Sequence, residues 1–258
     1  MPLYERTRTF EVDGMKVKVY ATREGMGAAA AEVVAQRIDQ VLAEKERVRI
    51  VFAAAVSQNE FLAHLCQAEG IDWTRIEAFH MDEYVGLPDE ASQRFGRFLR
   101  EHLFDCVQPG RVEYINGTAP DLEAECERYA VLLTKRPVDI VCAGIGENGH
   151  MAFNDPHVAD FEDPRTVKVV ELDSTCRMQQ VHDGAFATLD DVPTHALTLT
   201  MPALMSAHRI YCMVPGPTKR EAVRRTIEGP VTTACPATIM RRHNHAVLYL
   251  DAEAARDI

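Results

Sequence analysis

The chain has 258 residues, of which 47% are hydrophobic, and it carries a formal net charge of −11. That length suits one large α/β domain or two small ones, and the acidic charge disfavours nucleic acid and anionic membranes as partners. No apolar run reaches the ~18 residues of a membrane-spanning helix, and the opening stretch "MPLYERTRTF" lacks a signal peptide's apolar segment. We therefore expect a soluble, cytoplasmic protein with a single domain over residues 1–258.

The first predicted elements are a hairpin, a helix and a buried strand. The segment "TFEVDGMKVKVY" has two short strand patterns around Asp13-Gly14, a dipeptide that favours hairpin turns. Residues 27–45 place apolar side chains on one helical face. The next run, "VRIVFAAA", is continuously apolar, as is typical of parallel strands covered on both faces. Similar runs lie at 76–79, 138–144, 196–200, 209–214 and 245–250.

Helical patterns separate most of these strands, for example at 92–105 and 121–135. The alternation predicts an α/β fold, with a doubly wound, mostly parallel sheet that has helices on both faces (Rossmann-like). Ligands of such sheets bind beyond the carboxyl ends of the strands. Polar and ionisable side chains gather directly after the predicted strands: Ser57, Asp82, Glu83, His150, Asp155 and Lys219.

The cysteines point to a reducing environment. There are seven, an odd number, and no two form a C-x-x-C pair. Most lie in apolar surroundings, as Cys142 does in "IVCAG", which is typical of a buried small residue. We expect reduced thiols rather than a disulfide framework.

The stretch "GIGENGHMAFNDP", residues 144–156, fits G-x-G-x-x-G in its first six positions. A dinucleotide fingerprint needs a helix that begins within the glycine loop, whereas Asn154, Asp155 and Pro156 would end any helix almost at once. The glycines instead favour a tight turn that approaches a ligand closely. A bare turn without a ligand is the alternative, but it does not explain His150 with Asp155 just beyond it.

A histidine and a carboxylate from different strand ends suit general acid–base chemistry. Taken alone, Asp82 fits an ordinary acidic loop and His150 an ordinary turn; together they favour a site. Two bases allow two proton transfers, such as opening a sugar ring and then moving a proton between adjacent carbons. The sequence has no H-E-x-x-H motif, no paired Cys/His spacing and no G-x-S-x-G elbow, so we expect neither a metal site nor nucleophilic catalysis.

Two motifs carry a family resemblance, "MDEYVGLP" at 81–88 and "GHMAFNDP" at 149–156. Together with "INGTAPDLEAECERY", "LDSTCRMQQ" and "VPGPTK", they make the chain similar to the glucosamine-6-phosphate deaminase (isomerase) family. That family shares its fold with 6-phosphogluconolactonase. The resemblance implies conversion of glucosamine 6-phosphate and water to fructose 6-phosphate and ammonia, without metal or organic cofactor.

The resemblance also implies roles for individual residues. His150 would assist ring opening together with Asn148 and Asp155, and Asp82 would move a proton from C2 to C1 through an enolamine. Arg177 and Lys219 would hold the phosphate, as a cationic pair can do in an acidic protein. The loop from Ala54 to Gln58, with Ser57 as its hydroxyl, would cradle that phosphate.

Three positions depart from the family pattern. Asn148 replaces an Asp, Asp155 replaces a Glu, and "AAAVSQ" replaces the usual Thr-Gly-Gly/Ser-Thr-Pro loop. Because Asn carries no charge, it should stabilise a protonated His150 less than Asp would, and Asn148→Asp is expected to increase deaminase activity. A lactonase acting on a phosphorylated sugar acid and a non-catalytic sugar-phosphate sensor stay as alternatives, and a homo-oligomer is compatible with the sequence.

Overall fold

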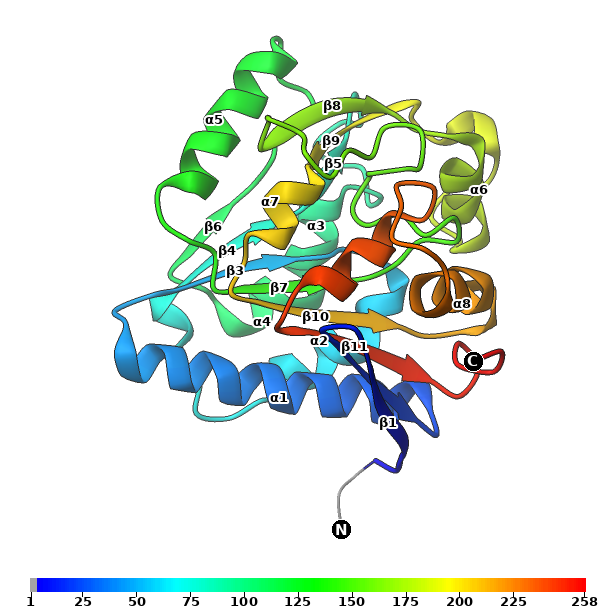
Figure 1. Cartoon of the computed structure of the whole chain (residues 1–258). Coiled ribbons are helices and arrows are strands. Elements are labelled where there is room, and N and C mark those ends of the chain that lie inside the picture. Colours follow the sequence, from blue (N-terminus) through cyan, green and yellow to red (C-terminus); the bar gives the residue numbers. More distant parts are fainter. Residues whose placement is uncertain (1–3) are drawn as a thin grey trace.

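The computed structural model describes residues 4–258 and contains two β-sheets flanked by helices (Figure 1). All neighbouring strands of the larger, eight-stranded sheet are parallel except the pair at its first edge, which forms the predicted hairpin. The strands, in spatial order, are β1 (Arg6–Val12), β2 (Met15–Tyr20), β11 (Ala246–Asp251), β10 (Arg209–Val214), β7 (Ile140–Ala143), β3 (Val48–Phe52), β4 (Ile76–His80) and β6 (Arg111–Glu113).

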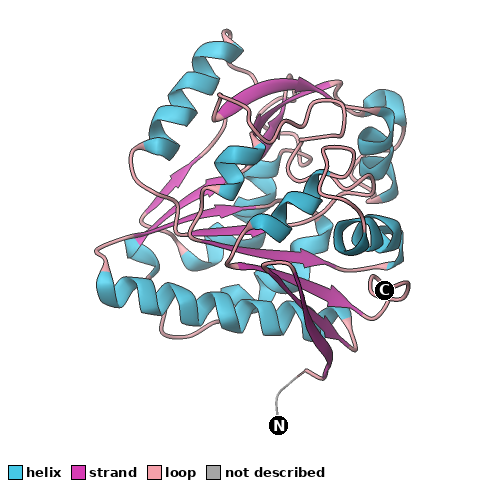
Figure 2. Ribbon diagram, in the orientation of Figure 1, coloured by secondary structure: helices cyan, strands magenta, loops and turns pink. Residues whose placement is uncertain are grey.

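Helices cover both faces of this sheet (Figure 2), as the alternating sequence pattern predicts. In β3, Ile50 and Phe52 pack into the core beneath α1 (Arg23–Glu44) and α2 (Asn59–Cys66). Val51 points the other way, into the core shared with α5 (Leu122–Thr134), α7 (Met201–Met205) and α8 (Arg220–Glu228). Burial on both faces is why these strands are continuous apolar runs. The doubly wound α/β fold is therefore confirmed.

The sequence predicts that the run at 196–200 is a strand of the parallel sheet, and this prediction is wrong. The run forms β9 (His195–Leu199), the middle strand of a three-stranded antiparallel sheet with β5 (Asp82–Tyr84) and β8 (Val167–Glu171). Four of its five residues are buried, so its sequence has the same apolar character as a central parallel strand. In Figure 1 this small sheet lies above the parallel sheet, and its strand β5 follows β4 almost directly along the chain.

The expectation of reduced thiols throughout is wrong for one pair. Cys66, at the end of α2, is bonded to Cys106 in α4 (Asp105–Val107). The two cysteines are 40 residues apart, and a π-helical turn (Arg100–Phe104) joins α3 (Phe95–Leu99) to α4. The five other cysteines are free and buried, as the sequence predicted.

The remaining elements are α6 (Ser174–His182) and short 3₁₀ turns at Val56–Gln58, Trp73–Arg75, Leu189–Asp191, Pro217–Lys219 and Pro236–Arg242. Within residues 4–258, no helix combines the length and the apolar character needed to cross a membrane.

Candidate active site

One pocket lies at the carboxyl edge of the parallel sheet. Its walls come from the loop after β3, the start of β5, the glycine turn after β7 and the middle of α6. Its lining contains both polar and aromatic side chains: Ser57, Gln58, Asp82, Phe95, His150, Phe153, Gln179 and Gln180. Ser57, Asp82 and His150 therefore share one pocket, as predicted from their places after separate strands, and Gln58, which the resemblance placed in the phosphate loop, lines it too. Asp155, predicted for the same pocket, is not in its lining.

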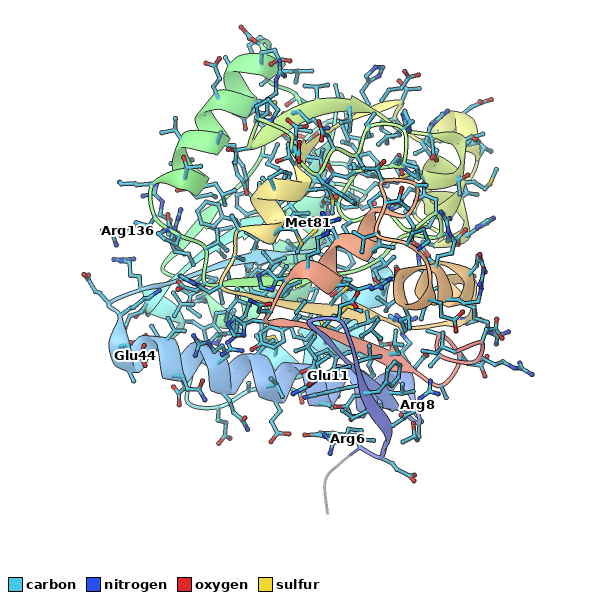
Figure 3. All side chains as sticks on the ribbon, in the orientation of Figure 1. Arg6, Arg8, Glu11, Glu44, Met81 and Arg136 are labelled. Carbon is cyan, nitrogen blue, oxygen red and sulfur yellow. A yellow bond between two sulfur atoms is a disulfide. The ribbon has the colours of Figure 1, made fainter. Side chains whose placement is uncertain are left out.

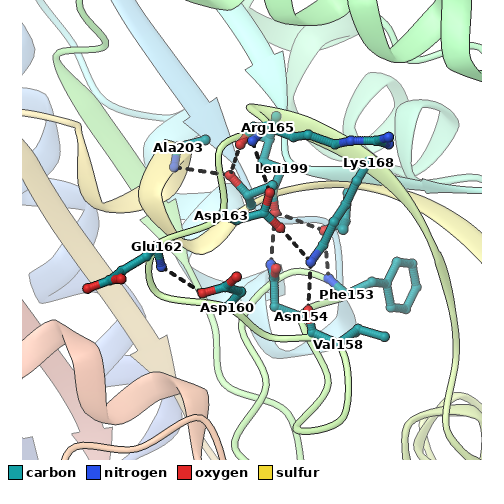
Figure 4. Close-up of polar contacts among 12 residues, drawn as sticks. Phe153, Asn154, Val158, Asp160, Glu162, Asp163, Arg165, Lys168, Leu199 and Ala203 are labelled. Carbon is teal, nitrogen blue, oxygen red and sulfur yellow. Dashed lines mark hydrogen bonds and ion pairs between the residues drawn. The ribbon is translucent and has the colours of Figure 1, made fainter.

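The small antiparallel sheet links the two sequence motifs. Asp82 pairs with Thr198 of β9, and the Thr198 hydroxyl accepts a hydrogen bond of 3.0 Å from the Phe153 amide. Asn154 donates to the Leu199 carbonyl at 2.8 Å, and Lys168 of β8 binds Val158 and Asp163 in the loop that follows (Figure 4). The chain from 153 to 163 is thus fixed to β8 and β9, which belong to the same small sheet as Asp82.

Asp82 presents a carboxylate that has no hydrogen bond from any described residue, although only 6% of the residue is exposed. It follows Met81, a buried side chain in the middle of the molecule (Figure 3). Burial, and secondarily the charge of Glu83, raises the pKa of Asp82 well above its usual range. A buried, unpartnered carboxylate of raised pKa is a stronger base than a solvated one, and it lines the pocket.

The neighbouring residue Glu83 has a structural role. Its carboxylate accepts hydrogen bonds from the amides of Tyr84, Phe95 and Gly96 at 3.0 to 3.1 Å. These bonds fix the start of α3 and hence Phe95, which lines the pocket. Of the two acidic neighbours, Asp82 faces the pocket and Glu83 supports its wall.

The glycine stretch forms a tight turn, not the start of a helix. The Gly146 amide donates to the His150 carbonyl at 2.9 Å, and the Gly149 amide donates to the Gly146 carbonyl at 3.0 Å. A Cβ at position 146 would lie 2.0 Å from Cε1 of His150, so only glycine lets the imidazole lie against the turn. Gly149 adopts a φ of +89°, which other residues rarely take. The geometry is that of a tight turn and not of a dinucleotide fingerprint, and the groups that its glycines approach closely are His150 and Cys235.

The imidazole of His150 is oriented through its Nδ1 atom. Nδ1 lies 2.8 Å from Oδ1 of Asn148 and 3.1 Å from Oδ1 of Asp155. Both neighbours are acceptors, so Nδ1 carries the hydrogen and the Nε2 lone pair is left over. In the described part of the chain, Nε2 has no hydrogen-bond partner, and His150 lines the pocket. His150 is therefore set up to accept a proton from a ligand.

Asn148 connects the imidazole to two carboxylates. Its Nδ2 atom donates to Asp155 at 2.9 Å and to Asp173 at 3.0 Å, while its Oδ1 also accepts from the His150 amide at 3.0 Å. The Asp173 amide donates to Oδ2 of Asp155 at 3.1 Å. Burial by itself raises the pKa of Asp155, but the imidazole and these hydrogen bonds outweigh it and lower that pKa overall. Asp155 therefore brings a negative charge to His150.

The loop after β3 differs from a simple phosphate cradle. Nε2 of Gln58 donates to the Met213 carbonyl at 3.2 Å and to the Ser57 hydroxyl at 3.1 Å. Because the Met213 carbonyl requires a donor, this bond fixes which end of the amide is oxygen. Oε1 of Gln58 is buried and finds no partner within residues 4–258. Gln58 thus lines the pocket and carries a buried acceptor that has no partner among the described residues.

The two expected phosphate-binding cations have different surroundings. Lys219 is 4% exposed, and its ammonium has no ion pair within 4.0 Å among the described residues. Burial lowers its pKa, although the facing charges of Asp183 and Glu147 act in the opposite direction. Lys219, like Arg177, is absent from the pocket lining, so its predicted convergence with Asp82 and His150 is not seen. Its connection to the pocket is electrostatic and indirect: Asp183 and Glu147, whose charges act on Lys219, bind Gln179, which lines the pocket.

Arg177 does not reach the pocket. Its guanidinium donates to the carbonyls of Leu189 at 2.6 Å and Val192 at 2.9 Å. These carbonyls belong to the turn that follows α6, and Arg177 is absent from the pocket lining. The structure therefore gives Arg177 a role in holding that turn, and the predicted convergence of Arg177 with Asp82 and His150 is wrong.

Sequence reasoning missed several residues of the site: Phe95, Phe153, Asp173, Gln179, Gln180 and Asp183. The stretch "LDSTCRMQQ" contains three of them, Asp173, Gln179 and Gln180, but the residue predicted from it was its only cation, Arg177. Nothing local in the sequence separates a glutamine that faces a pocket from one on a solvated helix.

Two overlapping groups of side chains have the spacing for a metal ion, and the second consists of Asp155, His157 and Asp173. Ligand atoms of His150, Asp155 and Cys176 lie within 4.8 Å of one another. The imidazole Nδ1 and both Asp155 oxygens already take part in hydrogen bonds, so a metal there would have to replace the network that orients His150.

The fold and the pocket define an α/β enzyme whose acid–base groups lie at the carboxyl edge of a parallel sheet. The chain belongs to the family described as glucosamine-6-phosphate isomerases/6-phosphogluconolactonase, whose sequence profile matches residues 21–249. It is 36% identical to the glucosamine-6-phosphate deaminase of Bacillus thuringiensis (strain Al Hakam) over 241 residues, which cover 93% of this chain and 88% of that protein.

Two solved structures illustrate the same relationship. A monomeric glucosamine-6-phosphate deaminase superposes with a TM-score of 0.86 at 30% identity, covering 94% of this chain and 99% of the other. A 6-phosphogluconolactonase from Shewanella baltica OS155 superposes with a TM-score of 0.76 at 18% identity, covering 92% of this chain and 97% of the other. The second likeness supports the fold alone.

Proposed function

We propose that this enzyme converts glucosamine 6-phosphate and water to fructose 6-phosphate and ammonia. The observation that carries the proposal is the presence of two separate proton-transfer groups in one pocket. These are the unpartnered carboxylate of Asp82 and the imidazole of His150, whose Nε2 is free. Isomerisation of a cyclic amino sugar needs both, because ring opening and carbon-to-carbon proton transfer take place at different atoms.

The first step is ring opening at His150. Nε2 takes the proton of the C1 hydroxyl and returns it to the ring oxygen, which leaves an aldehyde at C1. During this step the imidazole becomes positively charged, and the Asp155 carboxylate, 3.1 Å from Nδ1, stabilises that charge. Asn148 holds the ring in the required orientation through its Oδ1 atom.

The second step is proton transfer at Asp82. The carboxylate removes the proton from C2 while O1 takes up a proton from solvent, which gives an enolamine, and it then delivers the C2 proton to C1. Water then attacks the resulting C2 imine, so that ammonia leaves and the ketone of fructose 6-phosphate forms. The raised pKa of Asp82 matches this role, because the basicity of a carboxylate toward a carbon-bound proton increases with its pKa.

Binding of the phosphorylated substrate is assigned to Lys219, Ser57 and Gln58. Lys219 supplies a buried positive charge next to the pocket, and Ser57 supplies a hydroxyl in its wall. The free Oε1 of Gln58 accepts a hydrogen bond, so it suits a hydroxyl or ammonium group of the sugar rather than a phosphate dianion. Arg177 is not part of the proposal.

The deciding experiment measures ammonia released by the pure protein from glucosamine 6-phosphate, with galactosamine 6-phosphate, mannosamine 6-phosphate and unphosphorylated glucosamine as comparisons. Hydrolysis of 6-phosphogluconolactone is measured in parallel. Rapid lactone hydrolysis without ammonia release would establish the lactonase alternative. Binding of the sugar phosphates with neither activity would identify a sensor. A cytoplasmic location belongs to the same proposal, because sugar phosphates do not cross membranes unaided, and ultracentrifugation distinguishes a single chain from a homo-oligomer.

A further inference from the structure

We propose that Asp173 is a positioning residue for the acid–base reaction, because it holds both side chains that contact Nδ1 of His150. Its kinetic consequence rests on the function proposed above. Asp173 precedes α6, a helix that sequence analysis connected with the site only through Arg177. It touches no atom of the imidazole and acts through Asn148 and Asp155.

Three hydrogen bonds from one residue carry this inference. Oδ2 of Asp173 accepts from Asn148 at 3.0 Å, and the Asp173 amide donates to Oδ2 of Asp155 at 3.1 Å. Oδ1 accepts from the Cys176 amide at 2.6 Å and so caps α6. The first bond fixes the amide that accepts from the imidazole, and the second fixes the carboxylate that faces it. The third attaches both to a helix end.

Helix capping alone does not require this arrangement. Asp121 caps α5 with a hydrogen bond of 3.0 Å from the Ala124 amide, and its side chain makes no other hydrogen bond within the described residues. A capping carboxylate needs only one oxygen for that task. The second oxygen of Asp173 accepts a hydrogen bond from the side-chain amide of Asn148. That amide has two hydrogens: one binds Asp155 and the other binds Asp173.

Asp173 also contributes charge to the surroundings of His150. The ionisable groups nearby are Asp155 in contact, Asp173 behind Asn148, Cys176 close to Asp155 and Asp82 in the same pocket, with Glu147 paired to His182 at 3.3 Å farther out. Removal of one of these negative charges makes a protonated imidazole less stable.

The test compares two substitutions with matched controls. Asp173→Asn keeps an oxygen for the helix cap but turns an amide group toward the amide of Asn148. Asp173→Ser keeps the cap and cannot reach Asn148. We expect kcat for ammonia release to fall by about fivefold or more in both, with a smaller change in KM. The ring ¹⁵N signals of His150, measured by NMR at one fixed pH, should also change, because the groups that hold Nδ1 lose their support. Asp121→Asn and Asp121→Ser should change neither quantity.

The outcomes separate positioning from folding. Loss of thermal stability in the Asp173 variants, with kcat and the ring ¹⁵N signals of His150 unchanged, would show that Asp173 is only a helix cap and would overturn the proposal. Unchanged stability, kcat and ring signals would overturn it as well. If the parent protein releases no ammonia, the proposed function fails, but the ring signals still decide whether Asp173 acts on His150.

Discussion

Nδ1 of His150 lies 3.1 Å from the Asp155 carboxylate, although the neutral amide of Asn148 is nearer at 2.8 Å. The imidazole therefore has both an oriented neutral acceptor and a negative charge on the same side. A glutamate at position 155 is not needed for this contact, because the turn of residues 146–150 brings the shorter aspartate within reach.

Asp155→Asn should lower kcat by about tenfold or more, because the protonated imidazole loses its charged partner. The acid limb of the pH–rate profile should move to lower pH for the same reason. The pKa of Asp155 lies below its usual range, so its contribution to stability is present above the ordinary aspartate range and is lost as the pH falls through the folded-state pKa. Urea unfolding across the acid range should show a shallower loss of stability in the variant. An unchanged acid limb would contradict the assignment.

Asn148→Asp should now reduce activity, contrary to the expectation drawn from the sequence. A carboxylate at 148 would lose both amide hydrogens and face Asp155 and Asp173, whose oxygens lie 2.9 and 3.0 Å away. We expect a lower kcat and a lower melting temperature at pH 7, with partial recovery of stability in acid. Asn116→Asp, at an exposed turn, is the matched control. Higher ammonia release in Asn148→Asp than in the parent would refute this reading of the network.

Asp82→Asn should abolish turnover while increasing stability at neutral pH. Because burial raises the pKa of Asp82, the folded protein keeps a proton on this carboxyl group that the unfolded chain releases once the pH exceeds the usual aspartate pKa. Folding therefore becomes less favourable as the pH rises through that range. The neutral amide avoids that cost, so the melting temperature should rise at pH 7 and the difference should vanish near pH ~4. Exchange of the C2 proton with deuterated solvent measures the chemistry. If the variant exchanges this proton as fast as the parent, Asp82 is not the base.

Lys219→Met and Arg177→Met should affect different properties. Lys219 is the buried cation near the pocket, so its loss should weaken binding of sugar phosphates by about tenfold and leave binding of unphosphorylated glucosamine unchanged. Arg177 binds the carbonyls of Leu189 and Val192, so its loss should lower the melting temperature with little effect on affinity. Calorimetry with each ligand separates the two cases. A loss of phosphate affinity in Arg177→Met but not in Lys219→Met would show that Arg177, and not Lys219, binds the phosphate.

Gln58→Met should raise KM by about tenfold, because the pocket loses the acceptor that a sugar hydroxyl or ammonium would use. Affinity for methyl phosphate, whose dianion offers only acceptors, should stay unchanged. Gln36→Met on α1, an exposed position bonded to Glu32, serves as a control for the substitution itself. A parallel loss of phosphate affinity would mean that Gln58 belongs to a phosphate cradle after all.

The sequence by itself determined the parallel sheet and the acid–base residues at its carboxyl edge. Continuous apolar runs such as Val48–Phe52 record burial on both faces, and Asp82 and His150 follow strands directly, so their places depend on local pattern. The glycine turn was also readable, because Asn154 and Pro156 leave no room for a helix.

Only the tertiary structure decided the rest, because the partners involved are distant in the chain. The run at 196–200 is equally apolar in a parallel or an antiparallel sheet, and its pairing with Asp82 depends on residues more than a hundred positions away. The direction of Arg177, the bond between Cys66 and Cys106 and the unused oxygen of Gln58 likewise follow from packing between separate elements. A side chain's residue type fixes what it can donate or accept, but the fold fixes which groups come within hydrogen-bond distance of it.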